Sequence, residues 1–276
     1  MSDELEKEFL FPKTQDSKLK TKIALVLEYD GSNYCGFQFQ ENGPTVQDEI
    51  EKALFQLIGE KLRVLAASRT DTGVHARGQV ISFLTGSDLK PEAFVNGLNY
   101  YLPPDIAVKE SYQINNGFSV RRDAISREYR YLIFNGLSRS PLKRGYSYQV
   151  HRKLNVDAMN QAGQALIGEH DLVSFITKFN QSKIKSTFKT VYQSRVERKE
   201  DLVIFDIKAN SFLPHQVRNT VGMLIRVGLG KIDLDDFKTI MEARKPGLAG
   251  PTVPAQGLFL MRINYSRPLG DYDEDL

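Results

Sequence analysis

Residues 62–84, LRVLAASRTDTGVHARGQVISFL, place two apolar runs on either side of a polar turn. The runs 62–68 and 79–84 are short and mostly apolar, which is typical of strands. Between them Asp71 is the one carboxylate, and Gly73 lets the chain turn sharply. The stretch therefore predicts a strand, a turn that presents an acid, and a second strand.

Similar elements are predicted on both sides of this unit, in the same order in each half of the chain. Alternating apolar residues predict strands, and apolar residues spaced three and four apart predict helices. Strands are expected at 22–31, 62–68, 79–84, 106–114, 127–135, 190–199, 201–209 and 257–265, and helices at 44–59, 91–102, 155–168, 214–230 and 233–245.

The repeated order predicts an α+β fold made of two similar units, each ferredoxin-like or resembling an RNA-recognition domain. The two units are expected to share an extended mixed sheet, with helices on one face and a positively charged active-site cleft on the other. The expected boundaries are a flexible arm at 1–20, one unit at 21–120, a second at 121–268 and an acidic tail at 269–276.

The composition is that of a globular protein without a membrane span or a disulfide. The chain has 276 residues, of which 41% are hydrophobic and 26% charged, as in globular proteins. The sequence has no apolar run of the ~18 residues that a membrane span needs, and no secretory signal at its acidic start. Cys35 is the single cysteine, which excludes a disulfide within the chain and a cysteine-based zinc site. A cytoplasmic location is expected.

Positive charge is concentrated in two stretches of the second half. Residues 121–153 contain nine lysines and arginines against two acidic residues, and residues 178–199 contain seven against one. Clustered positive charge is typical of a surface that binds a polyanion such as RNA. Two solvated basic faces are the alternative.

Asp71 allows several interpretations when its own stretch is considered alone. It could be a turn residue that bonds to its own backbone, a metal ligand or a nucleophile. The four histidines (His75, His151, His170 and His215) have no ligand spacing, and the chain lacks a Gly-x-Ser-x-Gly elbow, a Walker loop and a Gly-x-Gly-x-x-Gly motif. A single carboxylate acting as nucleophile or base remains compatible with the sequence.

Two arginines are candidate partners for this acid, and an aromatic strand is a candidate surface for bases. Arg69 stands two residues before Asp71, and Arg218 lies in the expected helix 214–230, where it could pair bidentately with the carboxylate or simply face solvent. Tyr129 and Tyr131 share one face of a strand, with Arg127 nearby. Such a strand either stacks RNA bases or packs in the core.

Seven blocks of the sequence together resemble the tRNA pseudouridine synthase A family, in the family's order and spacing. The resemblance covers residues 22–266. The blocks are EYDGSNYCGFQFQ (28–40), TVQDEIEKAL (45–54), SRTDTGVHARGQV (68–80), NGFSVRRDAISREYRY (116–131), GEHDLVSF (168–175), NSFLPHQVRNTVGML (210–224) and PAQGLFL (254–260).

The resemblance implies an enzyme that isomerises uridine to pseudouridine at positions 38, 39 and 40 of the tRNA anticodon stem-loop. It implies no cofactor and no metal, and a homodimer in which one tRNA touches both subunits. By the same resemblance Asp71 is the catalytic aspartate and Arg218 its paired arginine. Tyr129 would pack against the target uracil, and Arg69 would help the base leave the stack. His75 then takes a structural role.

The sequence departs from the family's usual pattern at several positions. Phe37 stands where the family usually has tryptophan, and Ser119 and Arg122 stand where it often has histidine and an aromatic residue. These departures bear on contacts with RNA and leave Asp71, Tyr129 and Arg218 intact. Two other classes of protein are alternatives: an RNA-binding protein in which catalysis is lost or secondary, and a metal-dependent nuclease or hydrolase, for which the sequence lacks ligands.

Overall fold

The structure is a computed structural model that describes residues 20–177 and 186–273. The expected arm at 1–20, apart from Lys20, lies outside the described residues, as do 178–185 of the second basic stretch and 274–276 of the expected tail. No helix in the described ranges is both long and apolar enough to cross a membrane.

One mixed sheet runs through the described part of the chain. Its order is β4-β1-β3-β10-β5-β9-β8-β7, and β2 and β6 pair with β3 and β5. The predicted α+β class with an extended mixed sheet is confirmed. The described strands are β1 Thr21–Tyr29, β2 Leu65–Ala66, β3 His75–Thr85, β4 Ile106–Ile114, β5 Ser126–Phe134, β6 Tyr148–Gln149, β7 Gly168–Asp171, β8 Phe188–Lys199, β9 Leu202–Ala209 and β10 Leu258–Asn264.

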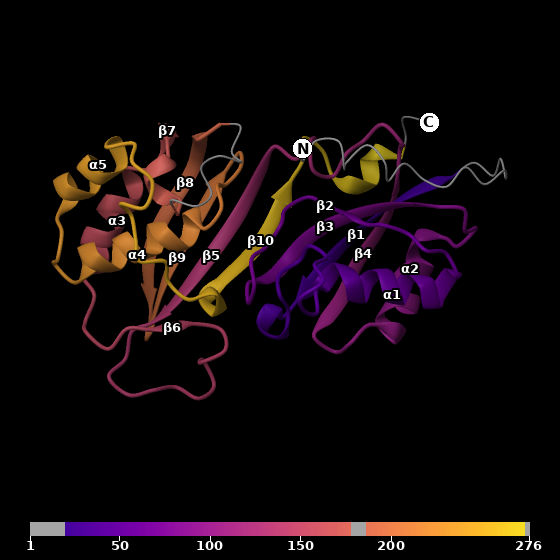
Figure 1. Cartoon of the computed structure of the whole chain (residues 1–276), viewed down its shortest axis with the longest axis horizontal. Coiled ribbons are helices and arrows are strands. Elements are labelled where there is room, and N and C mark those ends of the chain that lie inside the picture. Colours follow the sequence, from indigo (N-terminus) through magenta and orange to yellow (C-terminus); the bar gives the residue numbers. More distant parts are fainter. Residues whose placement is uncertain (1–19, 178–185, 274–276) are drawn as a thin grey trace.

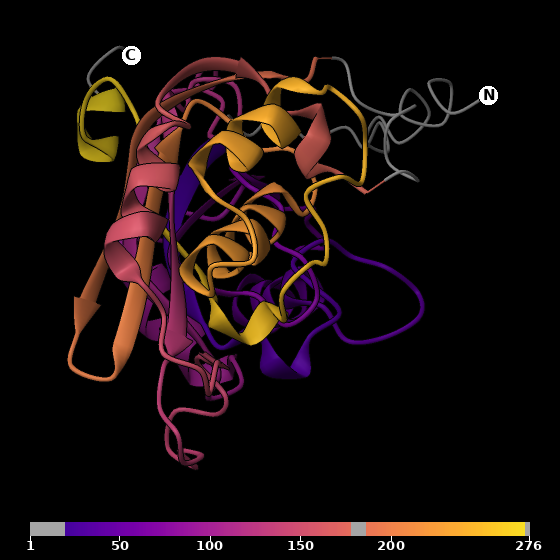
Figure 2. The same ribbon diagram turned by 90° about the vertical axis from the view of Figure 1, so that its left-hand side faces the viewer.

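Helices gather at the two ends of this sheet (Figure 1). Helix α2 packs on β4 and α1 packs on α2, while α3 packs on β8 and contacts both α4 and α5. The loop between β5 and β6 extends beyond the sheet in both views (Figure 2). The helices in the described ranges are α1 Val46–Ile58, α2 Pro91–Tyr101, α3 Val156–Gln164, α4 Gln216–Gly228 and α5 Leu234–Glu242.

Strand β10 joins the two ends of the sheet. It runs parallel to β3, with Phe259 opposite His75, and antiparallel to β5, with Leu258 opposite Tyr131. The predicted division at 120/121 falls between β4 and β5 and stays a prediction.

The expected strand 79–84 begins earlier, at His75, and most other predicted elements differ by a few residues at their ends. Two predicted elements are much shorter in the structure. The expected helix 155–168 ends at Gln164, and residues 168–171 form β7. The expected strand 62–68 is reduced to Leu65–Ala66.

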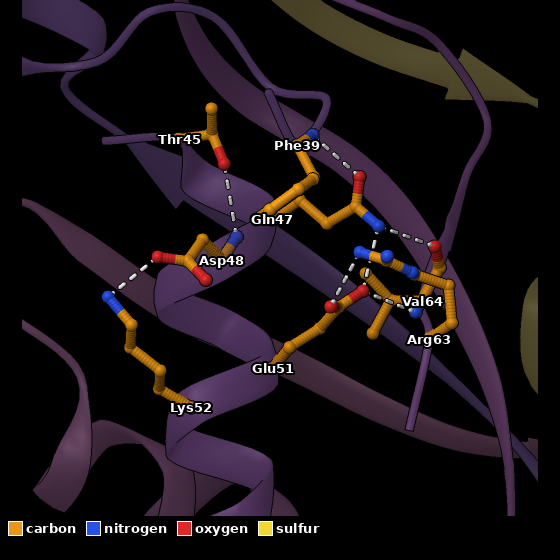
Figure 3. A network of polar contacts seen from close by, with 8 residues as sticks. All are labelled: Phe39, Thr45, Gln47, Asp48, Glu51, Lys52, Arg63 and Val64. Atoms are coloured by element: carbon orange, nitrogen blue, oxygen red, sulfur yellow. Dashed lines mark hydrogen bonds and ion pairs between the residues drawn. The ribbon is translucent and has the colours of Figure 1, made fainter. Parts of the chain in front are cut away.

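A network from α1 explains the shorter strand (Figure 3). The backbone N–H of Val64 donates to the Glu51 carboxylate at 3.0 Å, so it is not available to a neighbouring strand. Arg63 pairs with the same carboxylate at 3.0 Å, and Gln47 donates to it at 2.7 Å. Helix α1 therefore fixes the segment that leads into β2 and the turn after it.

The guanidinium of Arg127 binds four backbone carbonyls that come from three parts of the chain. Its Nη1 donates to Ala124 at 3.0 Å and Asn210 at 2.9 Å, and its Nη2 donates to Ala67 at 3.2 Å and Arg121 at 2.8 Å. Burial lowers the pKa of this group. The side chain therefore ties β2, the connection before β5 and the segment after β9 to one another.

Arg127→Lys is expected to lower the free energy of unfolding by about 1–3 kcal/mol, because an ammonium cannot donate to four carbonyls held in this fork. Arg262→Lys, at an exposed position of β10, should change it by less than about 0.5 kcal/mol. Urea unfolding of the two variants and the parent measures both. Equal midpoints for all three would contradict the role of Arg127.

Candidate active site

Asp71 lies on the turn between β2 and β3, as predicted. Gly73 has a φ of +75°, and Val74 N–H donates to the Asp71 carbonyl at 3.1 Å, which closes the turn. The Asp71 side chain is 37% exposed and reaches toward α4. The carboxylate is therefore presented at the surface of the protein.

Backbone contacts on both sides of Asp71 fix this turn against the loop that follows β1. The N–H of Phe37 donates to the Thr70 carbonyl at 3.1 Å, and the N–H of Gly73 donates to the Tyr34 carbonyl at 3.3 Å. Phe37, where the family usually has tryptophan, is itself buried in the core. The turn thus has little freedom to move the acid.

His75 is structural, as inferred from the sequence. Its side chain is buried, and its ring stacks on Phe259 with 4.7 Å between the centroids. Nδ1 lies 3.1 Å from Gly31 N, and Nε2 lies 3.1 Å from the Gln256 carbonyl oxygen. The histidine therefore links the loop after β1 to the entry of β10.

Arg218 reaches Asp71 from α4, across 147 residues of sequence. Its Nη1 lies 3.4 Å from Asp71 Oδ2, and its Nε donates to the Val253 carbonyl at 2.8 Å. The predicted pairing is present, but it is single rather than bidentate, since only Nη1 contacts the carboxylate while Nε donates to Val253. The Asp71 carboxylate therefore lies beside a positive charge that is itself held in place.

His215, the residue that immediately precedes α4, also reaches the same carboxylate. Its Nε2 lies 3.7 Å from Asp71 Oδ2. The sequence indicates no such role for His215. It stands before the helix with a left-handed φ of +60°, so the spacing rules that apply within a helix do not place it.

Tyr129 is brought next to the turn by β5. Its hydroxyl lies 3.0 Å from Ser68 Oγ, and its ring packs edge-on against Phe212 at 5.1 Å. Burial raises the pKa of Tyr129 to about 12, and the negative charge of Asp71 adds to the effect. The phenol is therefore neutral at physiological pH.

Arg69, the fourth predicted site residue, is exposed at the start of the same turn. Of the two interpretations of the strand, core packing holds for the neighbours of Tyr129. Tyr131 is fully buried and donates to the Pro254 carbonyl at 2.7 Å. Arg127 binds backbone carbonyls of its own chain.

A basic groove lies beside the loop that holds Arg218. Its volume is about 510 Å³, and Arg139 and Arg144 line it together with Pro254 and Gln256. A larger hollow of about 750 Å³ at α3 and β8 is lined by none of the predicted site residues. In the described ranges no three His, Cys, Asp or Glu side chains are grouped so as to hold a metal ion.

Comparison with known proteins identifies the family. The family model described as tRNA pseudouridine synthase matches residues 25–121 and 162–266. The chain is 42% identical over 243 residues to tRNA pseudouridine synthase A of Acetivibrio thermocellus, covering 88% of this chain and 99% of that protein. It is 43% identical over 248 residues to tRNA pseudouridine synthase A of Buchnera aphidicola, covering 90% and 93%.

Among solved structures, an H/ACA ribonucleoprotein bound to a substrate RNA containing 2′-deoxyuridine has a TM-score of 0.36 at 11% identity. The match covers 86% of this chain and 59% of that one. The sequence relatives extend over nearly all of the described fold, including the turn of Asp71 and helix α4. The chain therefore belongs to the tRNA pseudouridine synthase family.

Proposed function

We propose that this protein isomerises uridine to pseudouridine in the anticodon stem-loop of tRNA, with Asp71 as the catalytic carboxylate. The proposal rests on one observation: residues from distant parts of the chain lie next to the turn that carries Asp71. The Asp71 turn, Arg218 of α4 and Tyr129 of β5 come together, and the Asp71–Arg218 distance is 3.4 Å.

The reaction needs little from the protein beyond a well-placed carboxylate. The C1′–N1 bond of the nucleoside breaks, the uracil turns, C5 bonds to C1′, and the proton of C5 is lost while N1 gains one. Asp71 serves as nucleophile or base in this sequence. Arg218 places a positive charge beside this carboxylate and restricts its orientation. No cofactor is required for the net change.

The substrate must first expose its base. Taking a nucleotide out of a stacked stem-loop costs a few kcal/mol, and contacts to the flanking phosphates offset that cost. The groove lined by Arg139 and Arg144 supports such contacts, and the exposed Arg69 stands next to the acid that receives the base. We also propose, from the family, a homodimer that acts in the cytoplasm.

Asp71→Asn is expected to lower pseudouridine formation by a factor of about 10³ or more, because the amide can neither attack nor accept the proton. The affinity for tRNA should stay within about threefold, since no phosphate contact is lost. Release of tritium from tRNA labelled at uracil C5 measures turnover, and filter binding measures affinity. Turnover at the parent rate in this variant would refute the assignment.

Arg218→Lys is expected to lower kcat about 10- to 100-fold, because an ammonium cannot contact both Asp71 and the Val253 carbonyl in the same geometry. Arg226→Lys in the last turn of the same helix is the matched control and should leave kcat unchanged. Single-turnover assays with saturating enzyme compare them. An Arg218→Lys variant as fast as the control would refute the pairing.

Replacing Arg139 and Arg144 together by alanine should weaken tRNA binding and reduce its salt dependence. Two lost phosphate contacts should lower the slope of log K against log salt by about 1.4–1.8. Arg152→Ala, in the same basic stretch but outside the groove, should change the slope less. Titrations over a range of KCl concentrations measure the slopes, and an unchanged slope in the double variant would exclude the groove from RNA binding.

A further inference from the structure

Two side chains at the start of α4, His215 just before the helix and Arg218 in its first turn, converge on one oxygen of Asp71. Arg218 Nη1 lies 3.4 Å and His215 Nε2 lies 3.7 Å from Oδ2. Both contacts approach the same oxygen and come from one entry turn of one helix. An arrangement of this kind distinguishes the two carboxylate oxygens from each other.

The backbone at His215 is held in an unusual conformation. Its φ is +60°, in the left-handed region, which costs a residue with a side chain about 1–2 kcal/mol. Its neighbours keep it there. The Leu213 N–H donates to the buried Gln216 side chain at 2.8 Å, and the His215 carbonyl accepts from Asn219 N–H at 2.9 Å. The strain is therefore maintained by the structure around it, as at many functional sites.

The two ring nitrogens of His215 have different surroundings. Nδ1 is buried and has no hydrogen-bond partner among the described residues, whereas Nε2 faces Asp71. A buried N–H without an acceptor is costly. The surroundings therefore favour an N–H on Nε2, which faces the Asp71 carboxylate at 3.7 Å. Catalytic hydrogen bonds are often long in the free enzyme and shorten with substrate, which fits a distance of 3.7 Å.

We propose that His215 is a positioning residue that, together with Arg218, holds Oδ2 of Asp71 and leaves Oδ1 as the oxygen that acts on the nucleoside. The inference rests on the proposed role of Asp71. His215 contributes through the orientation of the carboxylate and makes no contribution to the affinity for tRNA.

Two substitutions at position 215 distinguish the effect of the ring N–H donor from the effect of the strained backbone. His215→Gly removes the ring, and glycine adopts a positive φ without strain. His215→Gln retains an N–H donor at about the reach of Nε2. The glycine variant should lower kcat about 10- to 100-fold with unchanged KM and an unchanged unfolding midpoint, because misorientation of a catalytic group affects the chemical step. The glutamine variant should recover most of that loss, and added imidazole should partly restore the glycine variant.

Asp71→Asn is assayed in parallel with the His215 variants. This comparison tests the proposed function and the role of His215 independently. An active Asp71→Asn variant refutes the proposed function. An inactive Asp71→Asn variant with a fully active His215→Gly variant refutes only the inference about His215. Equal losses in the glycine and glutamine variants, with no effect of imidazole, also overturn it, because the ring would then act by packing. His151→Gly, at an exposed position, controls for effects of imidazole itself.

Discussion

The arrangement of the site depends on the guanidinium of Arg127. One planar cation donates to carbonyls next to the acid's turn, in the connection before β5 and in the segment that leads to α4. Asp71 and Arg218 stand 147 residues apart, so no local structure can set their distance. A side chain with five fixed donors can hold several backbone segments at once, and a flexible ammonium cannot.

Rigidity is concentrated around an acid that itself remains accessible. The turn is bonded through its backbone to the loop after β1, Tyr129 is packed by Phe212, and Arg218 is anchored by the Val253 carbonyl. The side chains of Asp71 and His215 remain about one third exposed, and Arg69 is exposed. Preorganised groups need not rearrange during the reaction. A small number of such side chains can therefore give a large increase in rate.

Much of this could be predicted from the sequence, and the failures have physical causes. The turn of Asp71, helices α1 and α4 and the pairing of Arg218 with the acid follow from local patterns and from the family. A period of two places Tyr129 and Tyr131 on one face of the strand but does not show what covers each, so the sequence left base stacking and core packing both open for this strand. The position of His215 depends on a left-handed backbone that its residue type does not signal. The contact of Arg218 with Asp71 is single, and the second hydrogen bond of its guanidinium goes to the Val253 carbonyl, 35 residues away, which no local pattern predicts.

The place of β10 between β3 and β5 has a consequence for biosynthesis (Figure 1). This strand is the last of those described to leave the ribosome, yet it occupies the middle of the sheet. Until Asn264 has been made, β3 and β5 each lack the neighbour that joins them, and both present unpaired backbone groups. The nascent chain can therefore fold its two ends separately, but it can assemble the site only when the central strand arrives. A chaperone that shields exposed strand edges would act most usefully in that interval.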